Sequence, residues 1–471
     1  MRYLHLISSM DPRAGGPCQG IRNLTPRSHA AGHSVEVVCL DDPDSAYLAA
    51  ESREARAASN EPSTRSSPLE TPGYFKIHAL GKGRGAWSYH PALRPWLEKN
   101  LPRFDAVILN GLWQYPGFVM SQLARKLGDQ MPPYFVFPHG MLDPWFQRAP
   151  ERLWKAIRNW FYWKLIERHV IARAAAVFFT CAEEMRLAQK TFWPYRPKQQ
   201  VNVGYGISEP PEFHERMVTA FAEKCPGLDG RPYFLYLSRI HPKKGVDLLI
   251  QAYAKVYGEA AASRESRAAS FEPADSNSSL VAPRYPLPAT PALVIAGPGL
   301  DTDYGREMMR LATSIEQLAS SSESNPPSTI LHPRPQIFFP GMLTGDAKWG
   351  ALYRADAFVL TSHQENFGIA VVEALACASP VLISNQINIW REIEQEKAGL
   401  VAPDTLAGAE QLFRRWESLT YEARVAMTRA AQGSYMTRFG VANAAKNLLA
   451  TMEALVAGHK KVESRKQESE T

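Results

Sequence analysis

The chain has 471 residues, of which 45% are hydrophobic, and carries a formal net charge of +6 at pH 7. This length exceeds what one ordinary hydrophobic core holds and predicts two domains, while the small basic excess favours anionic ligands or surfaces without requiring nucleic acid. Five cysteines without pairing or metal-site spacing predict reduced thiols in the cytosol, and the lack of a long apolar run argues against a signal peptide or a transmembrane helix.

Short apolar runs separated by helix-like segments fill the first 205 residues. Such runs predict buried strands, and their alternation with helices is typical of a parallel sheet in a Rossmann-like domain. The predicted strands are Tyr3–Ile7, Val35–Leu40, Ala106–Leu109, Tyr134–Phe137 and Ala176–Phe179.

A second alternation of the same kind occupies residues 206–435 and predicts a second Rossmann-like domain. The join lies near Gly204–Ile207 and is followed by Pro210 and Pro211. A last helix-like run is predicted within residues 436–458. The predicted strands of the second series are Tyr233–Leu237, Leu293–Ala296, Ile337–Phe339, Ala357–Leu360 and Val381–Ile383.

Three stretches interrupt this pattern, at about residues 50–72, 260–290 and 320–335. They are rich in Ser, Ala, Pro and charged residues and contain few large apolar side chains. Such a composition cannot build a core, so these stretches are predicted to be mobile surface inserts. Residues 459–471 have a similar composition and are predicted to form a disordered tail.

Residues 362–374 read SHQENFGIAVVEA and combine two carboxylates, Glu365 and Glu373, with a loop that contains Gly368. They follow the predicted strand Ala357–Leu360 and run into an apolar helix. An α/β protein presents a ligand site in this way, at the carboxyl edge of its sheet. Backbone amides at the helix start would point at an anionic group placed there.

A second strand, loop and helix carries cations instead of carboxylates. After the strand Tyr233–Leu237, Arg239 offers a planar fork for phosphate oxygens and Lys244 a point charge, with Lys243 as an exposed neighbour. Cations on one loop and carboxylates on another would suit a nucleoside diphosphate-sugar. The cations could also offset the charge that builds on a departing diphosphate, so that no metal would be needed.

The R-x4-K-G of Arg239–Gly245 and the E-x7-E of Glu365–Glu373 resemble the retaining glycosyltransferases of family 4, which have the GT-B fold. The resemblance covers nearly the whole chain except the inserts and the tail. It implies two Rossmann-like domains facing across a cleft, with the acceptor side at 1–205, the nucleotide-sugar side at 206–435 and a helix at 436–458 that returns to the first domain. Weaker matches are Gly15-Gly16-Pro17, Ala31–Val35, Pro138–Leu142 and Val294–Gly299.

The resemblance also implies roles for particular residues. Glu365 would contact hydroxyls of the donor sugar and Glu373 the ribose, while His139 would contact the sugar or its transition state. Tyr205 replaces the Asn that this family usually carries near the domain join. The implied catalytic set is His139, Glu365, Arg239 and Lys244, and the substrate-binding set is Gly15, Gly16, Asn366, Phe367, Gly368, Ile369 and Glu373.

These features predict a retaining, hexosyltransferase-type enzyme that moves a sugar from a nucleotide-diphosphate sugar to a hydroxyl of a sugar or lipid-linked sugar acceptor, in polysaccharide or glycolipid biosynthesis. We expect no cofactor, no metal and no nucleic-acid partner, and a cytoplasmic location at the inner face of the membrane. A nucleotide-sugar epimerase of the same fold and a non-catalytic sugar-nucleotide-binding protein are the alternatives. A nicotinamide oxidoreductase is disfavoured because no G-x-G-x-x-G opens the first domain.

Asp301-Thr302-Asp303 has the D-x-D form that metal-dependent glycosyltransferases of another fold use. The motif also stands directly before a helix-like run, where Asp and Thr commonly cap a helix or form a turn. We favour the capping interpretation over a metal site.

Residues 145–173 interleave tryptophans with arginines and lysines. A basic aromatic helix can lie on an anionic membrane surface, which would suit a lipid-linked acceptor. Alternatively, Trp154, Ile157, Phe161 and Leu165 have helical spacing and could pack on the first domain. The spacing slightly favours packing with a basic outer face.

Overall fold

The computed structural model describes residues 1–49, 75–148, 152–269, 290–321 and 335–470. The chain divides into two compact units: unit 1 comprises Met1–Glu209 and Thr437–Thr471, and unit 2 comprises Pro210–Met436. The predicted insert at 50–72 lies outside the described residues, as do residues 270–289 and 322–334 of the other two. Residues 260–269 differ from the prediction, because they continue the helix α10 (Val246–Ala269).

In the described part of unit 1, the strands form one parallel sheet in the order β3-β2-β1-β4-β5-β6-β7. All five predicted strands are confirmed. The sequence pattern missed β3 and β7, because β3 is only half-buried and β7 has three residues. The strands are β1 (Arg2–Leu6), β2 (Ser34–Cys39), β3 (Phe75–Ala79), β4 (Ala106–Asn110), β5 (Tyr134–Phe137), β6 (Ala176–Phe179) and β7 (Gln200–Asn202).

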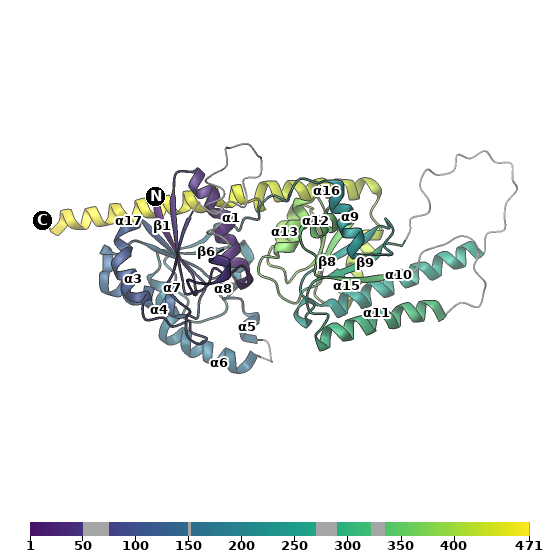
Figure 1. Cartoon of the computed structure of the whole chain (residues 1–471), viewed down its shortest axis with the longest axis horizontal. Helices are drawn as coiled ribbons and strands as arrows, with labels where there is room; N and C mark the ends of the chain where they lie inside the picture. The colour runs from purple at the N-terminus through teal and green to yellow at the C-terminus, as the bar shows by residue number, and fades with distance from the viewer. Residues whose placement is uncertain (50–74, 149–151, 270–289, 322–334, 471) are drawn as a thin grey trace. The chain divides into compact units, whose positions relative to one another are not determined.

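Helices cover both faces of this sheet (Figure 1). Alternation along β1 shows the two layers: Leu4 and Leu6 enter a cluster with α3, α4 and α7, whereas Tyr3 enters a cluster with α1 and α17. The helices of unit 1 are α1 (Gly16–Ala30), α3 (Leu93–Asn100), α4 (Tyr115–Leu127), α5 (Trp145–Arg148), α6 (Leu153–Tyr162), a π-helical turn (Trp163–Glu167), α7 (Arg168–Arg173), α8 (Ala182–Ala188) and α17 (Val441–Glu470).

The C-terminal helix α17 belongs to the core of unit 1, where Leu448 and Met452 are buried in the same cluster as Phe178. The predicted disordered tail differs from the structure, because α17 continues through residues 459–470. Lys, Glu, Gln and Arg are strong helix formers. A segment too polar to join a hydrophobic core can therefore still be helical.

Unit 2 contains a second parallel sheet, in the order β10-β9-β8-β11-β12-β13 within the described residues. The five predicted strands are confirmed here too. The short segment β13 was missed; its Gly399 lies so close to β12 that a Cβ atom there would stand 1.9 Å from the Val381 carbonyl oxygen. The strands are β8 (Tyr233–Leu237), β9 (Ala292–Ala296), β10 (Ile337–Gly341), β11 (Ala357–Leu360), β12 (Val381–Ser384) and β13 (Gly399–Ala402).

Successive residues of β8 again point to opposite layers. Phe234 packs its ring against Phe413 of α15, whereas the Tyr233 hydroxyl donates to the Ala351 carbonyl of α12 at 2.8 Å. Both units are thus helix-covered parallel sheets, which confirms the predicted fold class. The α-helices described in unit 2 are α9 (Glu215–Lys224), α10 (Val246–Ala269), α11 (Asp303–Ser321), α12 (Gly345–Arg354), α13 (Ile369–Ala376), α14 (Trp390–Gln395), α15 (Leu406–Glu417) and α16 (Tyr421–Ser434).

The described part of the tryptophan-rich segment is largely helical, but the predicted stripe of apolar side chains does not pack on the sheet. Trp154 is 84% exposed, Phe161 56% and Leu165 73%. The packing interpretation was therefore wrong for this stripe. None of the described helices has the length and apolar composition needed to span a lipid bilayer.

Candidate functional site

Gly245 brings the loop after β8 against the loop after β11. Its φ of 62° and ψ of 37° are left-handed, and a Cβ atom there would lie 2.4 Å from the Thr361 carbonyl oxygen. The Thr361 hydroxyl donates to the Gly245 carbonyl at 2.7 Å. Only glycine fits this close approach without strain.

Two further hydrogen bonds join the same loops at the carboxyl edge of the sheet. The His363 amide and the Ser362 hydroxyl both donate to the Lys243 carbonyl, at 2.9 and 3.1 Å. Because β8 and β11 are neighbours in the sheet, the cation loop and the carboxylate loop form one site.

Lys244 and Glu365 form an ion pair within this site. The Lys244 side chain is only 9% exposed, whereas 25% of the Glu365 side chain is exposed. An ammonium group has three donors, so Lys244 can bond the Glu365 carboxylate and an oxygen of a bound ligand at the same time. The sequence predicted both residues but not their pairing.

Arg239 differs from Lys244, because its side chain is exposed and has no hydrogen-bond or ion-pair partner among the described residues. Burial and the nearby cations Arg239, Lys243 and Lys244 lower the pKa of His241, which follows on the same loop. The three cations of this loop favour an anionic ligand.

Two glycines after β9 support this cation loop. A Cβ atom at Gly297 would lie 1.9 Å from the Ser238 carbonyl oxygen, and one at Gly299 would lie 2.6 Å from that of Ile240. The Ile240 amide donates to the Pro298 carbonyl at 2.8 Å. The glycine loop, which is a weak motif by itself, thus fixes the backbone on both sides of Arg239.

The carboxylate loop is held by backbone contacts to the loop after β12. The Glu365 amide donates to the Gln386 carbonyl, and the Asn388 amide donates to the Glu365 carbonyl, both at 3.0 Å. Next along the chain, the Asn366 amide oxygen accepts from the Asn388 side chain at 3.4 Å, and Phe367 is buried. Glu365 therefore has a fixed backbone position.

Gly368 starts helix α13 in the left-handed conformation, with φ 78° and ψ 65°. No side chain caps this helix start. The amides of Ile369 and Ala370, which are half-buried, therefore face outward from the first turn without a carbonyl of the helix to bond. Such a helix start favours a phosphate or another anion.

Glu373 lies one turn further along α13 and forms an ion pair with Lys348 of α12. The Lys348 Nζ and Glu373 Oε1 atoms are 2.7 Å apart, with side chains 24% and 14% exposed. No sequence motif marks Lys348, which belongs to an ordinary amphipathic helix. Each of the two predicted carboxylates is thus paired with an ammonium group.

Asp301 and Asp303 flank a helix cap. The Thr302 hydroxyl accepts from the Gly305 amide at 3.1 Å, and the exposed Asp303 carboxylate pairs with Arg306 at 2.5 Å. These contacts agree with the capping interpretation. In the part of the chain that the structure describes, His, Cys, Asp and Glu form no group of three that could hold a metal ion.

His139 follows β5 in unit 1 with a φ of 51°, and its ring stacks on Phe137 at 4.3 Å. Its Nε2 lies 3.1 Å from the Asn110 amide oxygen. The Asn110 side-chain nitrogen lies 3.2 Å from both the Ile108 carbonyl and the His5 ring, so the oxygen faces His139. The His139 Nε2 therefore donates and its Nδ1 is left as an acceptor.

Burial, and then the neighbouring His5 imidazole, lower the pKa of His139 to about 3. Burial alone lowers the pKa of His5 to about 3. Both rings are neutral at pH 7. The sequence did not single out His5 or Asn110, because each is one polar residue within an apolar strand.

A buried carboxylate anchors the loop that carries His139. The Glu184 carboxylate accepts from the Gly140 amide at 2.5 Å and from the Thr180 amide at 2.8 Å. Burying a carboxylate is costly unless its oxygens are hydrogen-bonded, as they are here. The bond from the Gly140 amide to Glu184 thus helps to fix the positive φ of the preceding residue, His139.

Gly15 and Gly16 lie at the start of α1, where Gly15 has a φ of 98° with open space at its Cβ position. The Tyr205 hydroxyl donates to the Gly16 carbonyl at 2.5 Å, and its ring lies against Gly20. The tyrosine therefore positions the first loop. No contact among the described residues joins either glycine to His139.

The structure gathers the predicted residues at two edges. Arg239, Lys244, Glu365, Gly368 and Glu373 lie at the carboxyl edge of the unit 2 sheet. Those of unit 1, which are His139, Gly15 and Gly16, follow strands at the carboxyl edge of the other sheet.

Comparison with known proteins identifies both units. A family model for a glycosyl transferase 4-like domain matches residues 15–206, and one for glycosyl transferases group 1 matches residues 293–433. A D-inositol 3-phosphate glycosyltransferase of Saccharomonospora viridis is 30% identical over 163 residues, which are 32% of this chain. The match spans 35% of that relative's own length.

Solved structures share the fold over nearly the whole chain. Anabaena HepE in complex with UDP and glucose has a TM-score of 0.63 at 14% identity, covering 96% of this chain and all of that one. Sucrose-phosphate synthase from Thermosynechococcus elongatus has a TM-score of 0.56 at 17% identity and covers 99% of both chains. The chain therefore belongs to the glycosyltransferases of the GT-B fold, with a glycosyl transferase 4-like domain in unit 1 and a glycosyl transferases group 1 domain in unit 2.

Proposed function

We propose that this glycosyltransferase moves a hexose from a nucleotide-diphosphate sugar to a hydroxyl group with retention of the anomeric configuration. The proposal rests on the groups gathered at the carboxyl edge of the unit 2 sheet. There, an Arg239 side chain with no partner among the described residues, the Lys244–Glu365 pair and the uncapped start of α13 belong to adjacent strand ends. Cations and helix amides suit a diphosphate, and carboxylates suit hydroxyl groups.

The donor would be held by all of these groups together. Arg239, Lys244 and the first amides of α13 would hold the diphosphate, Glu373 the ribose and Glu365 the sugar hydroxyls. The fold neighbour HepE was crystallised with UDP and glucose, which supports a nucleotide sugar as the donor class. The charges at this edge would stabilise the diphosphate as it departs.

In the transfer step, the bond between the anomeric carbon and the diphosphate oxygen breaks, and its electron pair stays on the diphosphate. The acceptor oxygen bonds to the anomeric carbon on the same face, and its proton passes to the departing diphosphate oxygen. No covalent carboxylate intermediate is needed, in contrast to retaining glycosidases. The step requires no cofactor, and fixed cations take the place of a metal ion.

The acceptor would be a sugar or a lipid-linked sugar held by unit 1, in polysaccharide or glycolipid biosynthesis at the cytoplasmic face of a membrane. The neutral Nδ1 acceptor of His139 suits a hydroxyl group of the transferred sugar. A nucleotide-sugar epimerase is the second candidate, because it would use the same donor site. A non-catalytic binding protein is the third.

A panel of labelled nucleotide sugars tests the proposal. We expect one donor to be hydrolysed slowly and to be transferred when an acceptor is added, with the product anomer unchanged. An isomerised sugar would indicate the epimerase, and binding without turnover would indicate a binding protein. Glu373→Ala should lower kcat/KM by roughly tenfold or more, because a charged hydrogen bond to the ribose is lost. The surface variant Glu223→Ala on α9 is the control.

Chelation tests the metal-independent part separately. Transfer should survive an excess of EDTA, because cations of the protein hold the diphosphate. A complete loss of activity that Mg²⁺ restores would contradict this and return Asp301 and Asp303 to consideration.

A further inference from the structure

Helix α6 and the π-helical turn that follows it direct a stripe of apolar side chains away from the core of unit 1. Trp154 and Leu165 are 84% and 73% exposed, whereas the side facing inward carries the buried Ala156, Asn159 and Trp163. An amphipathic helix of a globular protein normally does the opposite and buries its apolar face. This helix therefore has an apolar face that the described protein does not cover.

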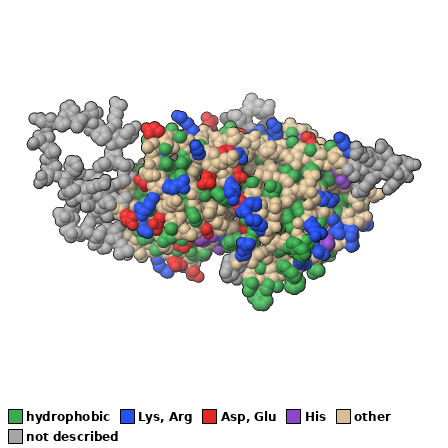
Figure 2. Space-filling view, turned by 180° about the vertical axis from the view of Figure 1, so that it is seen from behind, with side chains coloured by type: hydrophobic (Ala, Val, Ile, Leu, Met, Phe, Trp, Pro, Cys, Tyr) green, Lys and Arg blue, Asp and Glu red, His purple; other side chains and the backbone are tan. Residues whose placement is uncertain are grey.

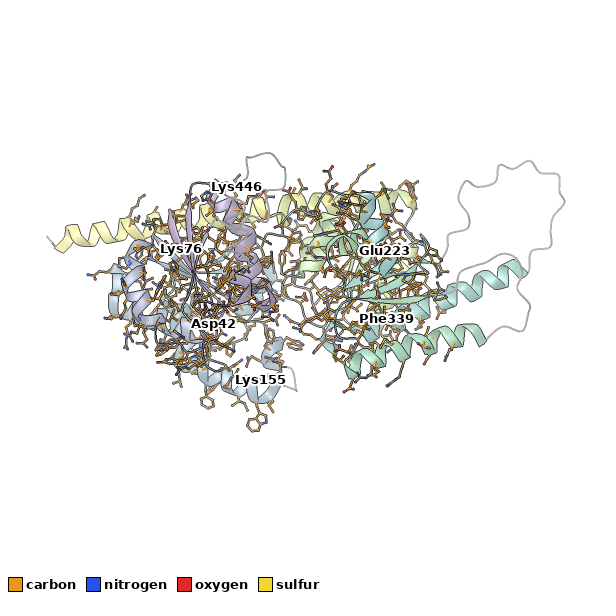
Figure 3. The ribbon with its side chains drawn as sticks, in the orientation of Figure 1. Asp42, Lys76, Lys155, Glu223, Phe339 and Lys446 are labelled. Carbon is orange, nitrogen blue, oxygen red and sulfur yellow. The ribbon has the colours of Figure 1, made fainter. Side chains whose placement is uncertain are left out.

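A second segment adds to this face. Trp193, which is 77% exposed, lies beside α6, since the Lys164 ammonium stands 4.7 Å from its ring centre and 5.5 Å from that of Trp160. Figure 2 shows hydrophobic side chains gathered where this part of unit 1 projects, and Figure 3 shows aromatic side chains that point away from α6 near Lys155. We call this the α6 surface; it consists of Trp154, Ile157, Trp160, Phe161, Leu165 and Trp193.

The described charged residues of α6 and of the turn after it, up to Ile166, are all positive. Lys155 and Arg158 are exposed on α6 and Lys164 follows on the next turn, while residues 152–166 contain no Asp or Glu. The next acidic residue, Glu167, is buried, and its carboxylate accepts from the Trp113 amide at 2.5 Å. The surface thus combines exposed aromatic and aliphatic side chains with uncompensated positive charge.

We propose that the α6 surface binds the interface of an anionic lipid bilayer. Tryptophan favours the level of the lipid head groups, apolar side chains enter the acyl boundary, and lysine and arginine contact anionic head groups. A second copy of the chain fits less well, because two such surfaces would bring like charges together. The inference does not rest on the donor site, which lies in unit 2. It would place the proposed sugar transfer at the membrane surface.

Flotation of the full chain with vesicles tests this directly. We expect binding to vesicles that contain phosphatidylglycerol and much weaker binding to vesicles of phosphatidylcholine alone. Changing Trp154, Phe161 and Leu165 together to Gln should lower the partition coefficient by at least about 100-fold, because three apolar anchors are lost. Lys155→Glu with Arg158→Glu should lower it by at least about 30-fold on anionic vesicles only, at roughly fivefold per cation.

Matched changes in unit 2 serve as controls. Tyr421→Gln with Met342→Gln alters exposed apolar side chains, and Arg216→Glu with Lys224→Glu alters exposed cations on α9. Both pairs should bind vesicles like the parent. All nine changed positions of the α6 and control sets should leave hydrolysis of the soluble donor unchanged, so a failure here is distinguishable from a failure of the proposed function.

Two results would overturn the proposal. The parent could fail to float with anionic vesicles and elute as an oligomer that the Gln variant converts to monomer, which would assign the surface to a second copy. Alternatively, the Gln variant and its control could bind equally well, which would place the membrane contact elsewhere.

Discussion

At the carboxyl edge of the unit 2 sheet, both predicted carboxylates are paired with ammonium groups and Arg239 adds an exposed cation, whereas the same edge of unit 1 carries two histidines around an amide. Lys244 pairs with Glu365 and Lys348 with Glu373. Burial keeps His5 and His139 neutral. One strand-and-loop geometry thus supports two electrostatic environments, of which the first suits a diphosphate and the second suits uncharged hydroxyl groups.

The largest effect on this comparison should come from Lys244→Ala. The change removes the buried cation and leaves the Glu365 carboxylate unpaired, so the unit 2 edge loses one positive charge and gains an uncompensated carboxylate where the diphosphate would bind. We expect kcat/KM for donor hydrolysis to fall by about 10²–10³, the usual cost of losing one preorganised group that stabilises developing charge. Steady-state hydrolysis with the donor found in the panel is the measurement.

The control for this prediction is Lys224→Ala, which removes an exposed lysine of α9 without a described ion-pair partner. It should leave hydrolysis unchanged. If circular dichroism shows that Lys244→Ala is folded and its turnover is normal, the charged edge is not the donor site.

A side chain added at Gly245 should destabilise the same edge by disturbing its backbone. Gly245→Ala places a Cβ atom 2.4 Å from the Thr361 carbonyl oxygen and in a left-handed conformation. We expect the free energy of unfolding of unit 2 to fall by about 3 kcal/mol, measured by urea denaturation. Gly258→Ala in α10 has open space and should be neutral or stabilising by up to ~1 kcal/mol. Equal urea midpoints for the two variants would contradict the close approach.

How much of this site the sequence predicts depends on whether a residue belongs to a motif. Arg239, Lys244 and Glu365 stand in loops after apolar runs, and Glu373 follows Glu365 at motif spacing in the next helix. The structure gathers all four at one edge. Lys348 reaches that edge from a helix with no motif. Its role depends on how α12 packs beside α13, which is a tertiary fact that local spacing does not contain.

The fold follows the same rule. Most strands that form apolar runs in the sequence were predicted, whereas β7, whose only apolar residue is Val201, was not. For α6 the helical period was correct but the direction was wrong. A stripe such as Trp154, Ile157 and Phe161 shows that one face is apolar, and only the buried Ala156 and Asn159 on the other side show which face meets the sheet.

The neutral histidine at the unit 1 edge should make the free energy of unfolding depend on pH. The pKa of His139 lies at about 3 in the folded chain and near 6.5 when unfolded, so below pH 6.5 only the unfolded chain gains this proton. Stability from the neutral ring is therefore present above pH 6.5 and is lost as the pH falls toward 3. In His139→Gln the free energy of unfolding should fall less steeply with acid, by up to ~1.4 kcal/mol per pH unit.

Urea denaturation of both proteins at pH 7, 6, 5 and 4 measures this difference. Each series is referred to its own value at pH 7, because the substitution also changes the contact with Asn110. Parallel curves would mean that His139 is already solvated in the folded chain, and the contrast between the two edges would lose its basis.

The smallest effect concerns how unit 1 holds its first loop. Unit 2 fixes Gly245 by backbone proximity, whereas in unit 1 the Tyr205 hydroxyl donates to the Gly16 carbonyl. Burial raises the pKa of Tyr205, so the hydroxyl keeps its proton and remains a donor. Tyr205→Phe keeps the ring against Gly20 and removes only this bond, which should cost about 1 kcal/mol and about 2–4 °C in Tm. Tyr421→Phe, at an exposed position, should leave Tm unchanged. If both variants melt with the parent, ring packing alone positions the loop, and the two units hold their glycine loops by the same means.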